Sequence, residues 1–374
     1  MNSPIREALL LLAVAVAVAP AQSKVSTGNG SWNSAGTWSP AGVPGTSDSV
    51  TILTGHIVTA TAACSAGVLV VKGRDEGTGA GGRFSNGTWP WRVYLRKSGG
   101  RTGNLIVEPG SVASGVFDQS DGGWTTIEGN YINSGTHTAG SVELIVDGVT
   151  VNNGSITRSA NATRSWVLRG GFTNNGSYAG LTARDPCSVG TAASGGAFVN
   201  NGTFANSGNS RLYFFGDLVN NQPGANFGNN YVFFPGGTDS RIGGSGGVRL
   251  WKAAIEKNAP ATTVTLDTTL VITEPSWGAL LIERGTLATN GESLSVWTEY
   301  LGGSMTLGGG PEGRLLVNNS PGGRQSRVFV ITLDQWDAPL GSVVVEDGLL
   351  HIREQHGIAW GVARFELRKG TVRY

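Results

Sequence analysis

Residues 151–156 read Val-Asn-Asn-Gly-Ser-Ile, and this pattern recurs with small changes. The further copies are Thr-Asn-Asn-Gly-Ser-Tyr at 173–178, Val-Asn-Asn-Gly-Thr-Phe at 199–204 and the degenerate Val-Asn-Asn-Gln at 219–222. Their leading asparagines are Asn152, Asn174, Asn200 and Asn220, so the spacing varies little and matches the length of a short solenoid repeat. Asn and Gly tolerate the left-handed backbone angles that tight bends require. The pattern therefore predicts short strands joined by tight bends at a nearly constant interval.

A second motif indicates a similar interval. It consists of a β-branched run, a charged residue or pair, a glycine and another apolar stretch, and it occurs at 105–112, 280–287, 343–350 and 365–372. Gly348 and Gly370 lie one such interval apart, and Gly285 precedes Gly348 by nearly three such intervals. Two motifs therefore predict one common period.

We take this period as about 22 residues, which accommodates two or three strands of about five residues and the bends between them. Stacked coils place equivalent residues about 4.8 Å apart, so the repeated asparagines are expected to form ladders of side-chain amides beside a continuous apolar core. We predict an all-β fold, a right-handed parallel β-helix or single-stranded solenoid, with about 14–16 coils. An N-terminal cap and the first coils would occupy 22–75, and solenoid repeats 76–374.

The same sequence pattern is also compatible with one alternative fold. Asn-Gly between strands is also a strong hairpin signal, so antiparallel ribbons in a sandwich or propeller are possible. The near-constant interval favours stacked coils, because hairpins have no reason to recur at one spacing. Helical patterning is confined to 253–257 (Ala-Ala-Ile-Glu-Lys), which suggests a single turn of helix.

The N-terminus is typical of an export signal. Arg6 precedes an apolar run from Ala8 to Ala19, and Ala19-Pro20-Ala21 supplies the small-x-small pattern of a signal-peptidase site. The run is shorter than the roughly 20 apolar residues of a membrane span, and no other segment approaches that length. We expect residues 1–21 to be removed, leaving a secreted, extracellular or cell-surface chain without a membrane span.

Composition excludes several classes. Glycine accounts for 59 of 374 residues, yet 39% of the chain is hydrophobic, which argues against disorder and against collagen. The net charge of +1 and the mixing of signs argue against a nucleic-acid partner. The two cysteines, Cys64 and Cys187, are too few to form the framework of the fold. A bridge between them is possible, but Cys64 is better explained as a small buried residue.

The segment 31–59 resembles the opening module of many secreted bacterial β-helix proteins of the pectin-lyase-like type. It also shares features with the extracellular domain family named for its eight glycines. The resemblance covers under a tenth of the chain and implies fold and export only, because proteins with this module range from adhesins and surface exoproteins to glycan-cleaving enzymes. The matching residues are Trp32, Gly36, Trp38, Pro44, Asp48, Val50, Ile52, Gly55, His56 and Val58.

This segment also makes physical sense as a cap. The first coil of a solenoid exposes a strand edge and an open core end, which must be covered. Trp32 and Trp38 are large enough to plug that end, and nearby prolines withhold amide donors from a passing strand. Asp48 is expected to organise the turn before the 49–53 strand. His56 has no second His or Cys near it in sequence, so we interpret it as structural.

Charged residues that suggest chemistry are few and dispersed. Asp118 and Asp121 form the most plausible pair for a calcium ion, but the loop offers few of the six to eight oxygens that calcium prefers, and a polar turn explains them as well. The stretch 350–356 alternates, so His351 and Arg353 would share an outer face. They are candidates for general acid–base catalysis or anion binding, although a solvated strand face explains them equally. No cofactor is otherwise indicated.

Trp89 and Trp91, on either side of Pro90, are the best candidates for binding a ligand. Alternation places both side chains on one side of the chain, and aromatic faces stack on sugar rings. A hydrophobic patch that shields a loop is the plainer explanation.

The sequence favours a non-enzymatic, secreted or cell-surface structural or adhesive solenoid that contacts glycans. Nucleophile elbow, zinc-type histidine pair and phosphate loop are all missing from it. One alternative is an extracellular polysaccharide lyase or glycoside hydrolase with a shallow groove along the solenoid, and another is a carbohydrate-binding module of a larger secreted protein. The expected partner is an extracellular polysaccharide or a cell-surface component. Residues 365–374 read as a core strand, which suggests end-on self-association or a longer chain.

Overall fold

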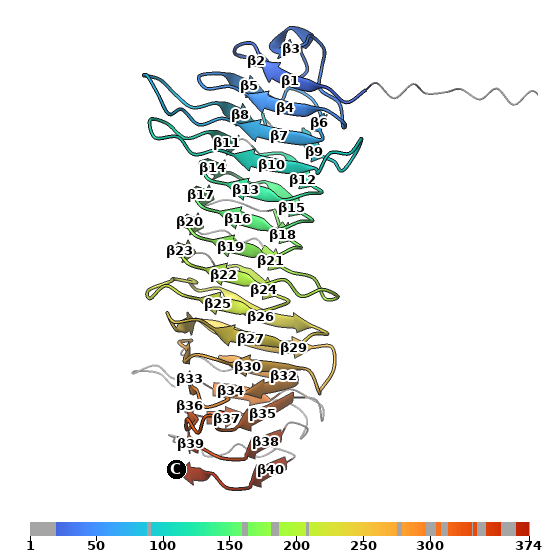
Figure 1. The fold of residues 1–374 in the computed structure, drawn as a ribbon. Helices are drawn as coiled ribbons and strands as arrows, with labels where there is room; N and C mark the ends of the chain where they lie inside the picture. Colours follow the sequence, from blue (N-terminus) through green and yellow to red (C-terminus); the bar gives the residue numbers. More distant parts are fainter. Residues whose placement is uncertain are drawn as a thin grey trace, which may run out of the picture.

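The computed structural model describes residues 20–373 except 88–90, 121, 159–163, 181–186, 207–208, 275–278, 297–303, 308–312, 331, 335–341 and 353–363. The described chain is an all-β parallel β-solenoid of about 13 turns (Figure 1). Its one helical element is the short 3-10 helix η1 (Ala35–Thr37). The predicted fold class is thus confirmed. Of the predicted export signal, residues 1–19 lie outside the described residues.

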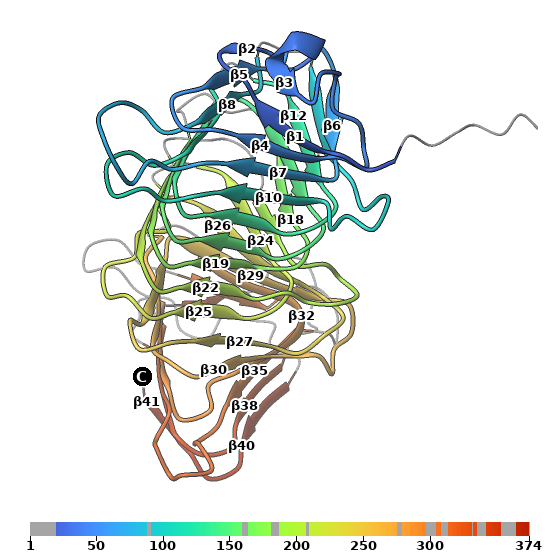
Figure 2. The same ribbon diagram turned by 45° about the horizontal axis from the view of Figure 1, so that its top comes forward.

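Each regular turn has three strands, one on each side of the solenoid. One turn consists of β12 (Trp124–Ile127), β13 (Tyr131–Asn133) and β14 (Thr136–Ala139), and the next of β15 (Glu143–Val146), β16 (Thr150–Asn152) and β17 (Ser155–Arg158). Each strand pairs in parallel with its counterpart one turn later. We call the three sides face C (β12, β15 and the strands stacked on them), face A (β13, β16) and face B (β14, β17). Figure 2 shows the face A strands lying beneath one another.

The turns are less uniform in length than the repeats suggest. On face A, Val50 of β4 (Ser49–Ile52) pairs with Leu69 of β7 (Val68–Val71), and Leu69 in turn pairs with Leu105 of β10 (Asn104–Val107). The second of these turns is almost twice as long as the first. Long loops, including the glycine-rich stretch 74–82, account for the difference. Because some turns are long, the chain forms about 13 turns rather than the 14–16 predicted.

The second motif marks two different corners, so part of the predicted periodicity is wrong. Gly285 lies within β32 (Leu280–Ala288), where the chain passes from face C to face A, and it pairs with Gly313 in the next turn. Gly348 instead follows the face A strand β38 (Ser342–Val345), so the interval from Gly285 to Gly348 does not equal three turns. Gly348 and Gly370 are one turn apart, because the Thr371 N–H donates to the Gly348 carbonyl oxygen (2.8 Å). Residues 253–257 belong to β29 (Lys252–Lys257) and form no helix.

The N-terminal segment covers the first strands of the solenoid. Trp32 and Trp38 are fully buried with ring centroids 5.1 Å apart, and the Trp38 indole N–H donates to the Trp32 carbonyl oxygen (2.8 Å). The strand β3 (Trp38–Ser39) turns back antiparallel to β1 (Ser23–Ser26) and covers its edge. Asp48 accepts the N–H groups of Gln22 and Gly45, both at 2.8 Å, which organises the turn before β4. The His56 Nδ1 lies 2.8 Å from the Ser26 hydroxyl.

Two asparagine ladders run along the corner between faces A and B, as the first motif predicted. The inner ladder is buried and is formed by side-chain amide bonds of 2.7–2.8 Å that link Asn133, Asn152, Asn174, Asn200 and Asn220 in order. The outer ladder is exposed and links Asn153, Asn175, Asn201 and Asn221 at 2.7–2.8 Å. The inner ladder begins one turn earlier than the motif, because Asn133 is followed by Ser-Gly rather than Asn-Gly.

The glycine of the first motif is required by close packing between turns and not by a positive φ angle. Gly154, Gly176 and Gly202 are absent from the described glycines with positive φ. They stack instead on one another, and a Cβ atom on Gly176 would lie 2.0 Å from the Gly154 carbonyl oxygen. Only glycine allows the bends of successive turns to approach this closely.

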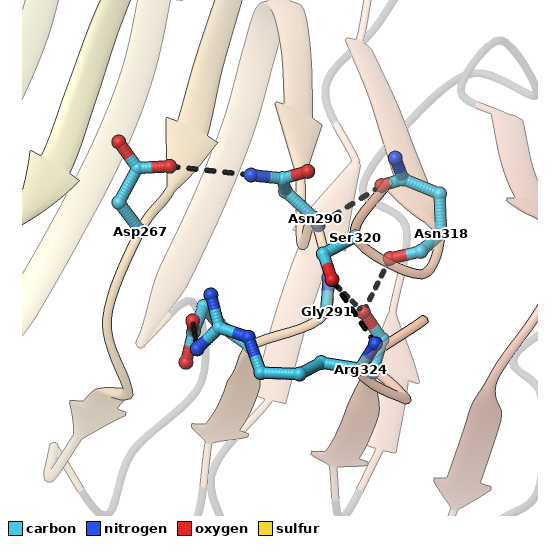
Figure 3. Close-up of polar contacts among 8 residues, drawn as sticks. Asp267, Asn290, Gly291, Asn318, Ser320 and Arg324 are labelled. Carbon is cyan, nitrogen blue, oxygen red and sulfur yellow. Dashed lines mark hydrogen bonds and ion pairs between the residues drawn. The ribbon is translucent and has the colours of Figure 1, made fainter. Parts of the chain in front are cut away.

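In the C-terminal half a mixed polar cluster holds the corner that follows face A (Figure 3). The Asn290 side chain donates to Asp267 (3.2 Å), and its backbone N–H donates to the side-chain oxygen of Asn318 (3.0 Å). Asn290 has a φ of 47°, the one positive φ among the described non-glycine residues, and Asn tolerates this conformation. The Arg324 N–H donates to the Ser320 hydroxyl (3.0 Å), which closes the following loop.

Candidate functional site: an aromatic and basic groove on face C

A shallow groove of about 180 Å³ lies on the outer side of face C. It crosses β9 (Arg92–Leu95), β12 and β15, whose alternate residues point into the core and outward. Val93, Leu95 and Ile127 are buried in the core, which turns their neighbours in sequence toward solvent. The residues that line the groove are Arg92, Val93, Tyr94, Trp124, Thr126 and Glu143.

Parallel pairing brings the outward side chains of the groove together. Trp124 pairs with Arg92 on one side and with Glu143 on the other, and Thr126 pairs with Tyr94. Residues opposite one another on neighbouring strands are close enough for their side chains to interact. The groove therefore gathers residues from three turns that are distant in sequence.

Arginine side chains lie over the aromatic rings. The guanidinium carbons of Arg92 and Arg164 lie 4.3 and 4.8 Å from the centre of the Trp124 ring. Arg92 also donates to the Tyr94 hydroxyl (3.2 Å). Such cation–π contacts are worth about 0.5–1 kcal/mol at exposed sites, so they favour one position of the guanidinium groups over the wide range open to a free arginine. The fixed groups present hydrogen-bond donors at the surface.

A further arginine extends this arrangement to the rim. The Arg96 guanidinium lies 5.0 Å from the Tyr94 ring centre, and its Nη1 lies 3.5 Å from a Glu128 oxygen. The site thus combines two aromatic rings, several guanidinium donors and the carboxylate acceptor of Glu143. This combination suits a ligand with both apolar faces and many hydroxyl groups. Within the described residues no group of three or more metal-ligating side chains occurs.

The predicted tryptophans lie beside this groove in sequence. Trp91 immediately precedes β9, and its carbonyl oxygen accepts the Trp124 N–H (3.2 Å). Trp89 lies outside the described residues. Sequence reasoning missed Trp124, although the alternation in Trp-Thr-Thr-Ile, with Ile127 in the core, would have turned it outward. Binding of a ligand by Trp89 and Trp91 stays a prediction.

Asp118, one of the two predicted calcium ligands, forms an ion pair on β11 (Val116–Gln119). Its carboxylate contacts the Arg83 guanidinium and accepts the Ser120 N–H (3.0 Å). Burial raises the pKa of the Asp118 carboxyl, but the hydrogen bond from Ser120 and the contact with Arg83 outweigh burial and lower it overall. Asp121 lies outside the described residues. A calcium role for this pair therefore stays a prediction.

His351 lies on β39 (Leu349–Ile352), on the side opposite the buried Leu350, as the alternation predicted. It pairs in register with Phe329 of β36 (Arg327–Val330) and Arg373 of β41 (Thr371–Arg373). Arg353 lies outside the described residues, so an acid–base or anion site there stays a prediction.

The two cysteines are free, so the alternative of a bridge between Cys64 and Cys187 is wrong. Cys64 is buried in the core, as expected. Burial raises the pKa of the Cys64 thiol well above its ordinary value and, against an opposing effect of Arg158, raises that of Cys187 to about 11. Both thiols are therefore protonated and weakly nucleophilic at neutral pH.

The comparisons with known proteins add no family assignment. The chain matches no protein-family model, no curated protein and no solved structure. In the part of the chain that the structure describes, no helix has the length and apolar character to cross a membrane.

Proposed function

We propose that this chain is a secreted or cell-surface structural and adhesive solenoid that binds an extracellular polysaccharide through the face C groove. The observation that carries the proposal is the convergence of Trp124, Tyr94, Arg92 and Glu143 on one solvent-facing site. Export rests on the N-terminal sequence alone. A carbohydrate-binding module of a larger protein would use the groove in the same way.

The mixed charges of the groove favour a polysaccharide over a nucleic acid as the ligand. Glu143 lies directly opposite Trp124 and would repel the closely spaced phosphates of a nucleic acid. Sugar hydroxyls, by contrast, both donate and accept, so they can use the arginine donors and the Glu143 acceptor together. Of the described residues that line the groove, Glu143 is the single carboxylate. A glycoside hydrolase of the usual kind needs two carboxylates at the bond that it cleaves, and this lining supplies one.

End-on association with another chain remains a separate proposal. Phe365 and Leu367 of β40 (Arg364–Leu367) have exposed fractions of 38% and 52%, and an end-on contact would cover them. Sedimentation of wild type and of a Leu367→Ser variant tests this contact.

Affinity electrophoresis in gels that contain single polysaccharides tests the groove. We expect retardation by at least one extracellular polysaccharide, and a loss of affinity of about tenfold or more in Trp124→Ala and Arg92→Ala, because hot-spot aromatic and arginine side chains carry most of the binding energy. Arg241→Ala is the matched control, since Arg241 is an exposed arginine on face A that lies 3.6 Å from Asp267. A wild-type chain that no polysaccharide retards, or variants that bind as wild type does, would contradict the proposal.

A further inference from the structure

A second aromatic and basic cluster lies farther along face C. It is formed by Arg211 and Tyr213 of β24 (Arg211–Phe214), Tyr231 and Phe233 of β26 (Tyr231–Gly236), and Lys252 of β29. The rings of Tyr213 and Phe233 are stacked with centroids 4.9 Å apart, and those of Tyr231 and Phe233 are 4.1 Å apart. The Lys252 Nζ lies 5.1 Å from the Tyr231 ring centre, and the Arg211 guanidinium 6.0 Å from that of Phe233. We call these five residues the distal cluster.

These aromatic rings lie outside the core of the solenoid. In β26 the residues Val232 and Phe234 are fully buried and face the interior, so Tyr231 and Phe233 stand on the outer side. Phe233 is nevertheless only 6% exposed, and the rings of Tyr213 and Tyr231 pack against it. Tyr231 remains partly open to solvent. Three neighbouring aromatic side chains on the solvent side of one sheet form a contiguous patch, which differs from apolar residues scattered singly over a surface.

The distal cluster shares its chemistry with the groove. Both combine aromatic rings with cations that lie over those rings. Burial, with the charges of Glu256 and Glu283, raises the pKa of the Tyr231 phenol to about 12. The phenol therefore keeps its proton at neutral pH and offers a hydroxyl donor to a ligand.

One straight column of paired residues joins the two sites. From Thr126 in the groove, the pairing passes through Ile145, Val167 and Ser188 to Tyr213. These are four steps between stacked strands, or about 19 Å at the usual strand spacing. The three residues of this column between the sites, Ile145, Val167 and Ser188, are uncharged. Figure 1 shows the strands from β12 to β24 following one side of the solenoid.

We propose that the groove and the distal cluster bind one extended polysaccharide chain that runs along face C, parallel to the long axis of the solenoid. This inference rests on the proposed function. An extended β-1,4-linked sugar polymer advances by roughly one strand spacing per sugar, so about five sugars span the four steps between the two sites. A polysaccharide that contacts both sites binds more tightly than one that contacts a single site. Once the first site is occupied, the second contact is intramolecular and forms at a high effective concentration.

A length series of oligosaccharides tests the inference. After electrophoresis has identified the retarding polymer among β-1,4-linked glucan, mannan and xylan, calorimetric titration uses its trimer and its octamer. We expect two trimers to bind each wild-type chain and one trimer to bind Tyr231→Ala or Trp124→Ala. One octamer should bind wild type, with at least tenfold loss of affinity in either variant and no measurable binding in the double variant.

Controls separate the possible failures. Val199→Ala, an outward change on face A, should bind as wild type does, and circular dichroism should show that all variants remain folded. If the octamer binds Tyr231→Ala as it binds wild type while Trp124→Ala loses it, the groove acts alone and this inference is overturned, although the proposed function stands. If no polymer binds wild type, the proposed function itself fails. If wild type is a dimer that Tyr231→Ala converts to a monomer, a second copy covers face C and the inference is also overturned.

Discussion

At the scale of single residues, the most unusual group is a histidine sealed inside the solenoid. His137 is fully buried, with Nδ1 2.8 Å from the Tyr131 hydroxyl and Nε2 2.9 Å from the Gln119 side-chain oxygen. Its ring stacks on Trp166, with centroids 5.4 Å apart. Burial, and then the charge of Arg158, lowers the pKa of His137 to about 3, against a smaller upward effect of Asp118.

Because the pKa of His137 is lowered in the folded chain, we expect the free energy of unfolding to decrease in acid. Its folded-state pKa lies below the ordinary value of 6.5, so the unfolded chain binds more protons between pH 6.5 and 3, and the free energy of unfolding falls as the pH falls through that range. At pH 5 the loss from this one group is about 2 kcal/mol. Urea unfolding at pH 7.5 and 5.0 should therefore show that His137→Gln costs about 2 kcal/mol less at pH 5.0 than at pH 7.5. An equal cost at both values would contradict the assignment.

At the scale of structural elements, the two asparagine ladders offer a matched comparison. Asn174 accepts from Asn152 (2.7 Å) and donates to Asn200 (2.8 Å) and to the Thr203 carbonyl oxygen (3.0 Å), all on the buried side. Asn175, the next residue, accepts from Asn201 and donates to Asn153, both at 2.8 Å, but on the exposed side. The two residues differ chiefly in access to water.

Removal of one amide from each ladder should therefore have unequal costs. Asn174→Ala leaves buried polar atoms without partners and is expected to lower the free energy of unfolding by about 3 kcal/mol. Asn175→Ala should cost less than about 1 kcal/mol, because water replaces the lost bonds. Urea denaturation of the two variants measures both values, and equal costs would show that the inner ladder is not the stabilising one.

The elements also show what the sequence could and could not predict. The ladder could be predicted from the spacing of Asn152, Asn174 and their equivalents, because these residues recur at similar intervals and occupy the same position in successive turns. The groove depends on Trp124 meeting Arg92 of the preceding turn, and that register is set by the lengths of long loops. Alternation shows which side chains point outward, but it does not show which turn lies beneath which. The predicted interval of three turns between Gly285 and Gly348 is wrong for the same reason, because the turns differ in length.

At the scale of the whole molecule, the described parallel strands pair with their counterparts in the turns above and below them. The stability of such a solenoid is approximately a sum of contributions from single turns and from the interfaces between them. The N-terminal end differs because Trp32 and Trp38 cover it, and the Trp32 ring also lies 5.4 Å from that of Phe84. A defect in this cap should therefore act mainly on the first turns.

Trp32→Ala tests this locality. Truncation of a fully buried tryptophan is expected to cost about 3–5 kcal/mol. Hydrogen–deuterium exchange should show faster exchange in β1, β4 and β7, with unchanged protection in β22 (Phe198–Asn200) and β25 (Leu218–Asn220). Trp124→Ala is the control, since it removes an outward tryptophan. Uniform loss of protection along the whole chain would show that the solenoid unfolds as a single unit.

The outer asparagine ladder also bears on chemical ageing. In a flexible chain, an Asn-Gly pair loses ammonia when the glycine nitrogen attacks the side-chain carbonyl carbon, and the cyclic imide then hydrolyses to aspartate or its isomer. In the folded chain the Gly176 N–H donates to the Asn152 carbonyl oxygen (3.0 Å), and the Asn175 amide is hydrogen-bonded on both sides. Both partners of the reaction are thus restrained, so the coils keep their amides intact for as long as they stay stacked.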